Sequence, residues 1–276
     1  MDGEGICAGE CVVGTKGITN HMTHNILILS CGTRDLLVRY FKKADFERVI
    51  GADCSELAPA LYEADKYYLI PRMKEEGYFD AILEICHKEG ITAILPLQED
   101  ELNLISENRE LFEQEGIRTI VSPVETLQIC RDKYRFFEHM TEHKIPVLNS
   151  YMDLAEFEKA YEAGKIGFPI FVKPVRGAGS IGVRKVSCME LLKTLFAYSE
   201  EPLLIQEFCN GREFGIDVYV DLVSDEVVDI FAKEKLRMRA GETEKSITCN
   251  DPALKEFAYR AASTLKLSGP IDMDVF

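Results

Sequence analysis

The fold is decided by the stretch Phe171-Val-Lys-Pro-Val-Arg-Gly-Ala-Gly-Ser-Ile-Gly-Val183. Its first half is an apolar, strand-like run that contains one lysine, Lys173, and closes on Pro174. Burying an ammonium group in a strand is costly unless an anion meets it. The second half carries glycines at positions 177, 179 and 182, which offer backbone N–H groups at little steric cost. Together the two halves indicate a site that binds phosphate.

The segment 177–182 also matches the fingerprint G-x-G-x-x-G of dinucleotide-binding proteins, which requires a helix directly after the loop. Here the loop is followed by Val183-Arg-Lys-Val186, which is typical of a strand, and the next helix is expected only near Ser187. A strand–glycine loop–strand unit is a flap that closes over phosphates, as in protein kinases. No Gly-Lys-Ser/Thr ends the loop, so it is not a Walker A loop. The alternative is a hairpin whose lysine pairs with a neighbouring carboxylate.

The composition is that of an ordinary soluble protein. The 276 residues are 46% hydrophobic and 29% charged, and the chain is long enough for two domains. A net charge of −15 argues against nucleic-acid and anionic-membrane surfaces, and no apolar run approaches the roughly 20 residues that span a bilayer. Nine scattered cysteines and no visible secretory signal favour a reducing compartment. We therefore expect a cytoplasmic protein without nucleic-acid or membrane partners.

Residues 1–23 form a polar, glycine-rich leader that we expect to be disordered. Cys7 and Cys11 in this leader have no second pair nearby, so they are a poor zinc site. Met22 stands just before the first expected strand, which makes it a candidate native start beside Met1.

The first half of the chain alternates strands and helices, which predicts a parallel sheet covered on both faces. Gly32 after the first strand and Asp53 at the end of the second imitate a dinucleotide-binding layout, but only one glycine is present. The expected strands are Ile26–Leu29, Arg48–Asp53, Thr92–Leu97 and Arg118–Val121, and the expected helices are Thr33–Lys43, Gly77–His87 and Asp100–Glu115.

The second half predicts an α+β domain, with a boundary near residue 121. Ser122-Pro-Val-Glu125 is a capping box that starts one helix running to about His143. His139 and His143 share a face of that helix, and without a third ligand we interpret them as surface residues. Further helices are expected at Asp153–Ala163, Met189–Tyr198 and Asp251–Leu267, and further strands at Leu203–Glu207, Glu213–Asp221 and Val227–Lys233.

Five features occur in an order that resembles the ATP-grasp superfamily, especially its carbamoyl-phosphate synthase large-subunit-like members and related carboxylate–amine ligases. They are Asp132-Lys133, Lys173, the glycine loop, Gln206-Glu-Phe-Cys209 leading to Glu213, and Gly269-Pro-Ile-Asp-Met-Asp274. The resemblance covers residues 25–276, and Ala64–Pro71 and Ile94–Glu101 are phrases typical of the family's preceding domain. It implies an α/β protein with a Rossmann-like pre-ATP-grasp domain over 24–121. An ATP-grasp domain over 122–276 follows, with a glycine-flap lobe at 147–200 and a second lobe at 201–276.

The resemblance implies roles for individual residues in binding ATP and magnesium. Lys133 and Lys173 would contact the phosphates, where a compact ammonium suits a moving phosphoryl group. Backbone groups of Glu207 and Cys209 would meet the adenine edge, and Glu213 would accept the ribose hydroxyls. The glycine flap and the hinge would complete the nucleotide site through Gly177, Gly179, Ser180, Gly182 and Gln206.

The segment Lys233–Glu242 is a basic, glycine-containing loop that is similar to the family's loop near the γ-phosphate. Lys235 or Arg239 would offset developing negative charge there, and the sequence does not choose between them. A solvated basic surface is the alternative.

Asp274 matches the first metal-binding side chain of the family, whose Glu-x-Asn pair one strand later would lie beyond Phe276. We expect a truncated, C-terminally incomplete chain that binds ATP weakly and does not turn over, from an intact parent enzyme.

The resemblance implies an ATP-dependent ligase that activates a small-molecule carboxylate as an acyl phosphate for attack by an amine. A homodimer is one candidate assembly. The rival hypotheses are a non-catalytic ATP-binding or regulatory remnant and an NAD-dependent oxidoreductase that uses Gly32 and Asp53.

Overall fold

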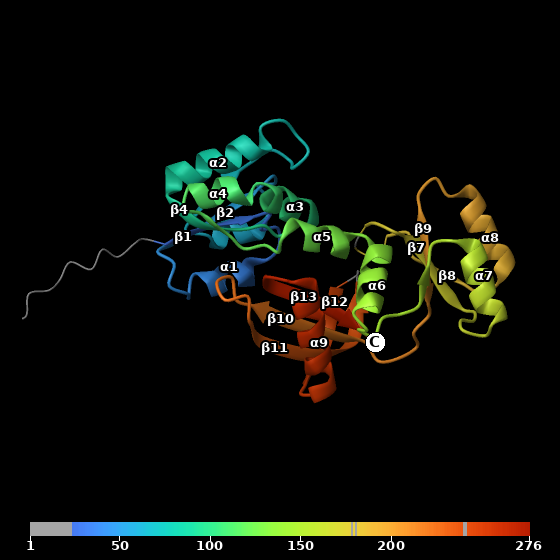
Figure 1. The fold of residues 1–276 in the computed structure, drawn as a ribbon. Coiled ribbons are helices and arrows are strands. Elements are labelled where there is room, and N and C mark those ends of the chain that lie inside the picture. Colours follow the sequence, from blue (N-terminus) through green and yellow to red (C-terminus); the bar gives the residue numbers. More distant parts are fainter. Residues whose placement is uncertain (1–23, 178, 180, 240–241) are drawn as a thin grey trace, which may run out of the picture.

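The computed structural model describes residues 24–177, 179, 181–239 and 242–276. These residues form three separate sheets with helices against them (Figure 1). Residues 1–23 lie outside this part, so the expectations for Cys7, Cys11 and Met22 do too, as does that for Ser180.

The first sheet is parallel, as the alternating pattern predicts. Its order is β3 (Lys66–Leu69), β2 (Arg48–Asp53), β1 (Asn25–Leu29), β4 (Ile91–Leu95) and β5 (Arg118–Thr119). Every residue of β1 is buried, and its alternate side chains enter two different cores. One core includes residues of α2 (Tyr78–Glu89), α3 (Glu99–Glu107) and α4 (Arg109–Gln114), and the other includes residues of α1 (Asp35–Phe41) and the 3-10 helix η1 (Pro59–Glu63).

Two expectations for this half are corrected. The prediction of a single helix Asp100–Glu115 is wrong, because Asn108 separates α3, which ends at Glu107, from α4, which begins at Arg109. The Asn108 amide donates to the carbonyl of Leu104 at 2.8 Å and so competes with the helical backbone. Strand β3 was not predicted, since its side chains are mostly exposed and show no apolar alternation.

The expected helix from Ser122 to His143 is also wrong. It is two helices, α5 (Val124–Arg131) and α6 (Lys133–Glu142), separated by Asp132. The Asp132 carboxylate accepts the N–H groups of Tyr134 and Arg135 and caps α6. The capping box fails because the Ser122 hydroxyl donates to the carbonyl of Ser268 at 3.1 Å and accepts its N–H at 3.0 Å. A long-range contact has replaced a local one.

The second sheet contains the glycine-loop hairpin. Its order is β6 (Ser150–Tyr151), β9 (Leu203–Glu207), β7 (Ile170–Pro174) and β8 (Arg184–Val186), with antiparallel neighbours throughout. The predicted strand–loop–strand order is confirmed, because β7 pairs with β8 across the loop. Helices α7 (Leu154–Glu162) and α8 (Met189–Tyr198) pack on this sheet around Phe157 and Leu192.

The third sheet is antiparallel, in the order β12 (Glu242–Cys249), β11 (Val227–Arg239), β10 (Phe214–Val220) and β13 (Gly269–Val275). The helix α9 (Pro252–Leu265) and α6 contribute to the core on one face. The basic segment expected to be a loop is strand as far as Arg239, so that expectation is wrong. Pairing with the unpredicted β12 accounts for this, since Lys235 lies opposite Ser246 and Arg237 opposite Lys245.

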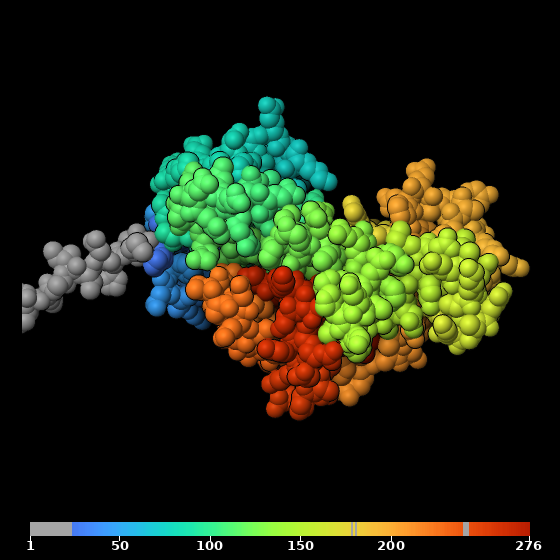
Figure 2. All heavy atoms as spheres, viewed as in Figure 1, coloured from blue at the N-terminus to red at the C-terminus, as the bar shows by residue number. Residues whose placement is uncertain are grey.

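The third sheet lies against the first half of the chain (Figure 2). The hydroxyl of Thr126 donates to the carbonyl of Leu265 at 2.7 Å, and Arg118 donates to the carbonyl of Leu222 at 3.2 Å. Among the helices of the described ranges, none is long and apolar enough to cross a membrane.

Candidate functional site

Lys173 lies on β7 and is half-buried, as the sequence predicts. Its ammonium donates to the side-chain oxygen of Gln206 on β9 at 2.6 Å. Gln206 in turn donates to the hydroxyl of Ser150 at 3.0 Å. This chain of hydrogen bonds orients the lysine without neutralising its charge. Burial, with the nearby Lys133, lowers the pKa of Lys173 to about 8.

Lys133 begins α6 and reaches the start of the glycine loop. Its ammonium donates to three carbonyl groups, those of Pro174 at 3.2 Å, Val175 at 3.3 Å and Gly177 at 2.7 Å. Its backbone N–H also donates to Val175. Burial lowers the pKa of Lys133, and the opposing influence of Glu99 and Asp132 does not outweigh it. The two predicted phosphate lysines are therefore neighbours at the base of the hairpin.

The described glycines of the loop have the backbone conformation that requires glycine. Gly177, Gly179 and Gly182 have φ values of +115°, +66° and +75°. At Gly182 an added Cβ would also lie 2.9 Å from Cγ of Pro174. These conformations suit a loop whose N–H groups point at an anion.

Phe208, in the hinge segment after β9, forms an aromatic pair with Phe171 of β7, and neither ring has a role predicted from the sequence. The rings of Phe171 and Phe208 have centroids 5.1 Å apart, and the Lys185 ammonium lies 4.0 Å from the centre of the Phe208 ring. Phe171 precedes Lys173 by two positions, so it shares the same face of β7. That spacing is the signal that could have identified it.

The other hinge residues have structural contacts of their own. The Glu207 carboxylate accepts the amide of Asn149 at 2.8 Å, and the Glu207 N–H donates to the Asn149 carbonyl at 2.9 Å. Cys209 is a partly buried free thiol. Only six residues, 208–213, separate β9 from β10, so the hinge joins the second and third sheets directly.

Glu213, Lys235 and Asp274 form a cluster on the third sheet. The Lys235 ammonium donates to Glu213 at 3.0 Å and to Asp274, and its side chain is only 7% exposed. Burial opposes the charged form of Lys235, but hydrogen bonds to Asp274 and Glu213 outweigh it and raise the pKa. Three residues predicted for three separate roles are therefore in direct contact.

Arg239 lies apart from this cluster. It is at the end of β11, its side chain is 77% exposed, and it pairs with Glu244 on β12 at 3.3 Å. Of the two cations between which the sequence did not choose, the structure brings only Lys235 to Glu213 and Asp274.

Gly32 and Asp53, the two residues that imitate a dinucleotide-binding layout, are joined by a hydrogen bond between the loop that follows β1 and the end of β2. Asp53 accepts the N–H of Gly32 and the N–H of Ser55, each at 2.9 Å, with one carboxylate oxygen each. The helical histidines differ in exposure, since His143 is exposed while His139 is half-buried and contacts the carbonyl of Thr264.

The residues present fit a magnesium nucleotide. Lys133, Lys173 and the loop N–H groups are donors for phosphate, the Phe171 and Phe208 rings suit a base, and Glu213 is an acceptor for ribose hydroxyls. Asp274 is an oxygen ligand of the kind magnesium prefers, and its carboxylate is about half exposed.

Family models match most of the chain. The model for the PylC-like N-terminal domain matches residues 26–120, and the model for the ATP-grasp domain matches residues 130–276. The two matches correspond to the parallel first sheet and to the two antiparallel sheets.

Curated relatives match at about one quarter identity. The carbamoyl phosphate synthase large chain of Clostridium acetobutylicum is 26% identical over 187 residues, which are 65% of this chain and 17% of that protein. A D-alanine–D-alanine ligase of Francisella philomiragia is 25% identical over 162 residues, 54% of this chain and 53% of that enzyme. The chain thus spans from about a sixth to about half the length of these relatives.

Solved structures share the fold at lower identity. N5-carboxyaminoimidazole synthetase from Staphylococcus aureus, complexed with ADP, matches with a TM-score of 0.69 and 16% identity, over 91% of this chain and 66% of that one. The biotin carboxylase domain dimer of Hydrogenobacter thermophilus 2-oxoglutarate carboxylase, in complex with MgADP, ADP and bicarbonate, matches with a TM-score of 0.69 and 18% identity, over 92% and 61%.

Proposed function

The chain belongs to the ATP-grasp family, whose domain model matches residues 130–276, and from this premise we propose that it binds Mg-ATP for a carboxylate–amine ligase reaction. The carboxylate and the amine are small molecules. A carboxylate oxygen attacks the γ-phosphorus and ADP leaves. The nitrogen of the amine, in its unprotonated form, then attacks the acyl carbon, phosphate leaves, and the phosphate takes the proton that the nitrogen loses.

One observation carries the proposal. Lys173 is a half-buried cation whose side-chain partner is a neutral amide, and within the described residues it forms no ion pair with a carboxylate. A structural lysine at such a depth is ordinarily compensated by an anion. Burial, followed by the charge of Lys133, lowers the pKa of Lys173 to about 8, and a phosphate would supply the compensating negative charge.

The remaining residues take roles that follow from their positions. Lys133 and the loop glycines would bind the phosphates beside Lys173, and Phe171 and Phe208 would contact the base. Glu213 would accept the ribose hydroxyls. Asp274 would bind magnesium, which supplies positive charge to the phosphates, while Lys235 would offset the charge that develops on the γ-phosphoryl group.

Similar proteins support this class of reaction. The matching relatives include carbamoyl phosphate synthases and D-alanine–D-alanine ligases, and a Bacillus licheniformis L-amino acid ligase has the same fold. Their different names show that the fold alone does not specify the carboxylate or the amine.

Calorimetric titration with ATP and magnesium tests the proposal. We expect the unaltered chain to bind Mg-ATP and Lys173→Met to lose at least about tenfold in affinity, since a charged hydrogen bond contributes roughly 1.5–3 kcal/mol. Lys165→Met is the matched control, because Lys165 is an exposed lysine on the same lobe. Unchanged affinity in Lys173→Met, or an unaltered chain that does not bind Mg-ATP, contradicts the proposal.

ATP binding without turnover is a second candidate function, favoured by one observation. Lys235 lies between Glu213 and Asp274 and pairs with both, so these two carboxylates already have a cationic partner. Phosphate release, screened against carboxylates and amines, separates the two functions: release that depends on both substrates favours the ligase.

A further inference from the structure

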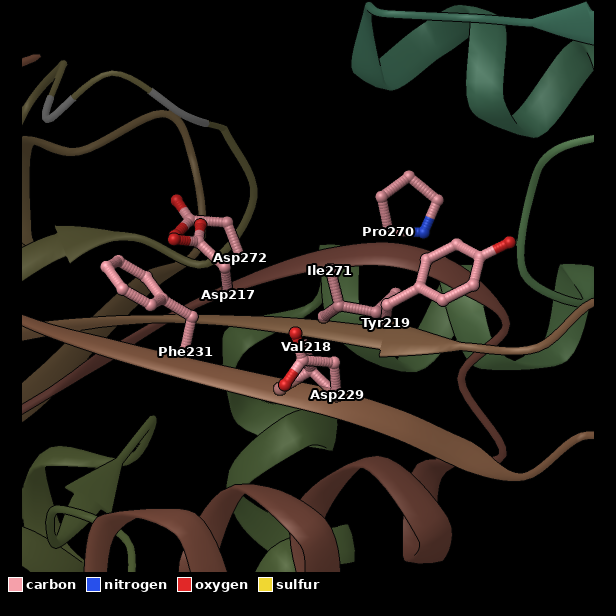
Figure 3. Close-up of a pocket in the computed structure, with 8 residues that line it drawn as sticks. All are labelled: Asp217, Val218, Tyr219, Asp229, Phe231, Pro270, Ile271 and Asp272. Carbon is pink, nitrogen blue, oxygen red and sulfur yellow. The ribbon is translucent and has the colours of Figure 1, made fainter. Parts of the chain in front are cut away.

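The open face of the third sheet carries a depression of about 330 Å³ next to the Glu213–Lys235–Asp274 cluster. The register of β10 and β13 fixes its position. Asp274 lies opposite Gly215, and the next pair on the same face is Asp272 opposite Asp217. The depression therefore begins one outward-facing residue away from the carboxylate proposed for magnesium. It is lined by Asp217, Val218, Tyr219, Asp229, Phe231, Pro270, Ile271 and Asp272 (Figure 3).

Its two central carboxylates form an unfavourable pair. Like charges directly opposite in an antiparallel sheet are destabilising. Asp217 accepts a hydrogen bond from Lys233 at 2.6 Å, whereas Asp272 has no hydrogen-bond or ion-pair partner in the part of the chain that the structure describes. Lys233 therefore compensates the charge of Asp217 but leaves that of Asp272 without a partner among the described residues.

The other walls of the depression indicate what kind of cation fits. Figure 3 shows the carboxylates of Asp217 and Asp272 close together beside the Phe231 ring, with Tyr219 and Pro270 farther along the strands. Aromatic faces attract organic ammonium ions, and the apolar surface suits a carbon chain. Asp217 and Asp272 lie at one end beside Phe231, and Tyr219 and Pro270 lie at the other with Asp229 opposite Tyr219. The lining therefore combines negative charge with apolar surface and suits an ammonium on an apolar body.

We propose that this depression binds the amine substrate in its protonated form, with Asp217 and Asp272 at the ammonium group and Phe231 and Tyr219 along its carbon body. The proposal rests on the ligase function proposed above, because it places the amine beside Asp274, where the activated carboxylate would form. It specifies the amine as an organic cation of moderate size, in keeping with the volume of about 330 Å³.

Two probes of equal body and different charge test the proposal. 1-Aminopentane is protonated at about pH 7, and 1-pentanol is neutral. Binding of each probe is followed by NMR titration of the full chain, of Asp272→Asn and of Asp45→Asn. Asp45→Asn removes the same charge at an exposed position between α1 and β2. We expect 1-aminopentane to bind about tenfold more weakly to Asp272→Asn and unchanged to Asp45→Asn, with 1-pentanol weak throughout.

Equal 1-aminopentane affinity in Asp272→Asn and the unaltered chain would overturn the proposal, as would 1-pentanol binding as tightly as 1-aminopentane. Asp272→Asn relieves repulsion, so its melting temperature should not fall, which separates lost binding from lost folding. Mg-ATP affinity is measured on the same samples. If the chain binds Mg-ATP but not 1-aminopentane, the proposed amine site is refuted and the proposed function stands. If it binds 1-aminopentane but not Mg-ATP, the proposed function is refuted and the cation site stands.

Discussion

Two charged side chains, the buried Glu89 at the end of α2 beside the first sheet and the half-buried Lys173 in the second sheet, have opposite surroundings. Glu89 is 3% exposed and accepts hydrogen bonds from Lys66 at 2.6 Å, Arg48 at 2.8 Å and the hydroxyl of Tyr68. Hydrogen bonds to Lys66 and Tyr68 lower its pKa to about 2. The Lys173 ammonium, in contrast, donates to the neutral side-chain amide of Gln206 and has no charged partner among the described residues. A charge that the fold compensates serves stability, and one that it leaves uncompensated is available to a ligand.

The largest expected effect is on the compensated charge. Glu89→Ala should lower the free energy of unfolding by about 3 kcal/mol, because it removes hydrogen bonds to two cations and a hydroxyl. Urea denaturation measures this, and Glu84→Ala on the exposed face of α2 is the control, expected to change little. Mg-ATP affinity should stay unchanged in both variants. A loss below about 1 kcal/mol in Glu89→Ala would show that the cluster is not a stabilising one.

A carboxylate placed beside Lys173 should compensate its charge in the way that Lys66 and Arg48 compensate the charge of Glu89. Gln206→Glu places a carboxylate 2.6 Å from the ammonium in the same geometry. It should raise the pKa of Lys173 and weaken Mg-ATP binding by roughly tenfold, because the lysine then has an internal partner that competes with phosphate. Gln206→Met, which removes the hydrogen bond without adding charge, controls for lost orientation. If Gln206→Glu bound Mg-ATP as well as the unaltered chain does, competition for the ammonium would be refuted.

The smallest effects are in the pH dependence of stability, where both groups should make stability rise with pH, but in different pH windows. Glu89 has a folded pKa of about 2, below its ordinary value, so its contribution is present above about pH 5 and lost as the pH falls toward 2. Lys173 has a folded pKa of about 8, also below its ordinary value. Its unfolded form binds more protons between about pH 8 and 10.5, so stability should rise with pH across that window.

Denaturation curves measured against pH check both windows. The acid slope should be shallower in Glu89→Ala, and the rise of stability above about pH 8 should be smaller in Lys173→Met, than in the unaltered chain. Parallel pH profiles for Lys173→Met and the unaltered chain above pH 8 would contradict the assignment of the alkaline slope to this lysine.

The sequence predicted those elements whose causes are local. β1 and β2 are mostly apolar runs, and the loop between β7 and β8 is rich in glycine, so both patterns can be identified from the sequence. Lys173 was identifiable because a lysine stands out in a strand.

Other elements depend on partners far away in the chain. Ser122 has the sequence context of a helix cap, but its hydroxyl forms hydrogen bonds with Ser268 instead. In the sequence Lys235 is one of several basic residues, and only the fold brings Glu213 and Asp274 to it. Asp217 and Asp272 became a site only through the register of two strands. Sequence patterns carry no information on such pairings, which tertiary packing decides.

Lys133 already uses its full hydrogen-bonding capacity. An ammonium has three N–H donors, and those of Lys133 are directed to the carbonyl groups of Pro174, Val175 and Gly177. A phosphate oxygen can therefore gain a bond from Lys133 only by displacing one of these carbonyls. Each such exchange breaks one hydrogen bond between α6 and the hairpin. Phosphate binding at Lys133 and the position of the glycine loop should therefore be coupled in one conformational equilibrium.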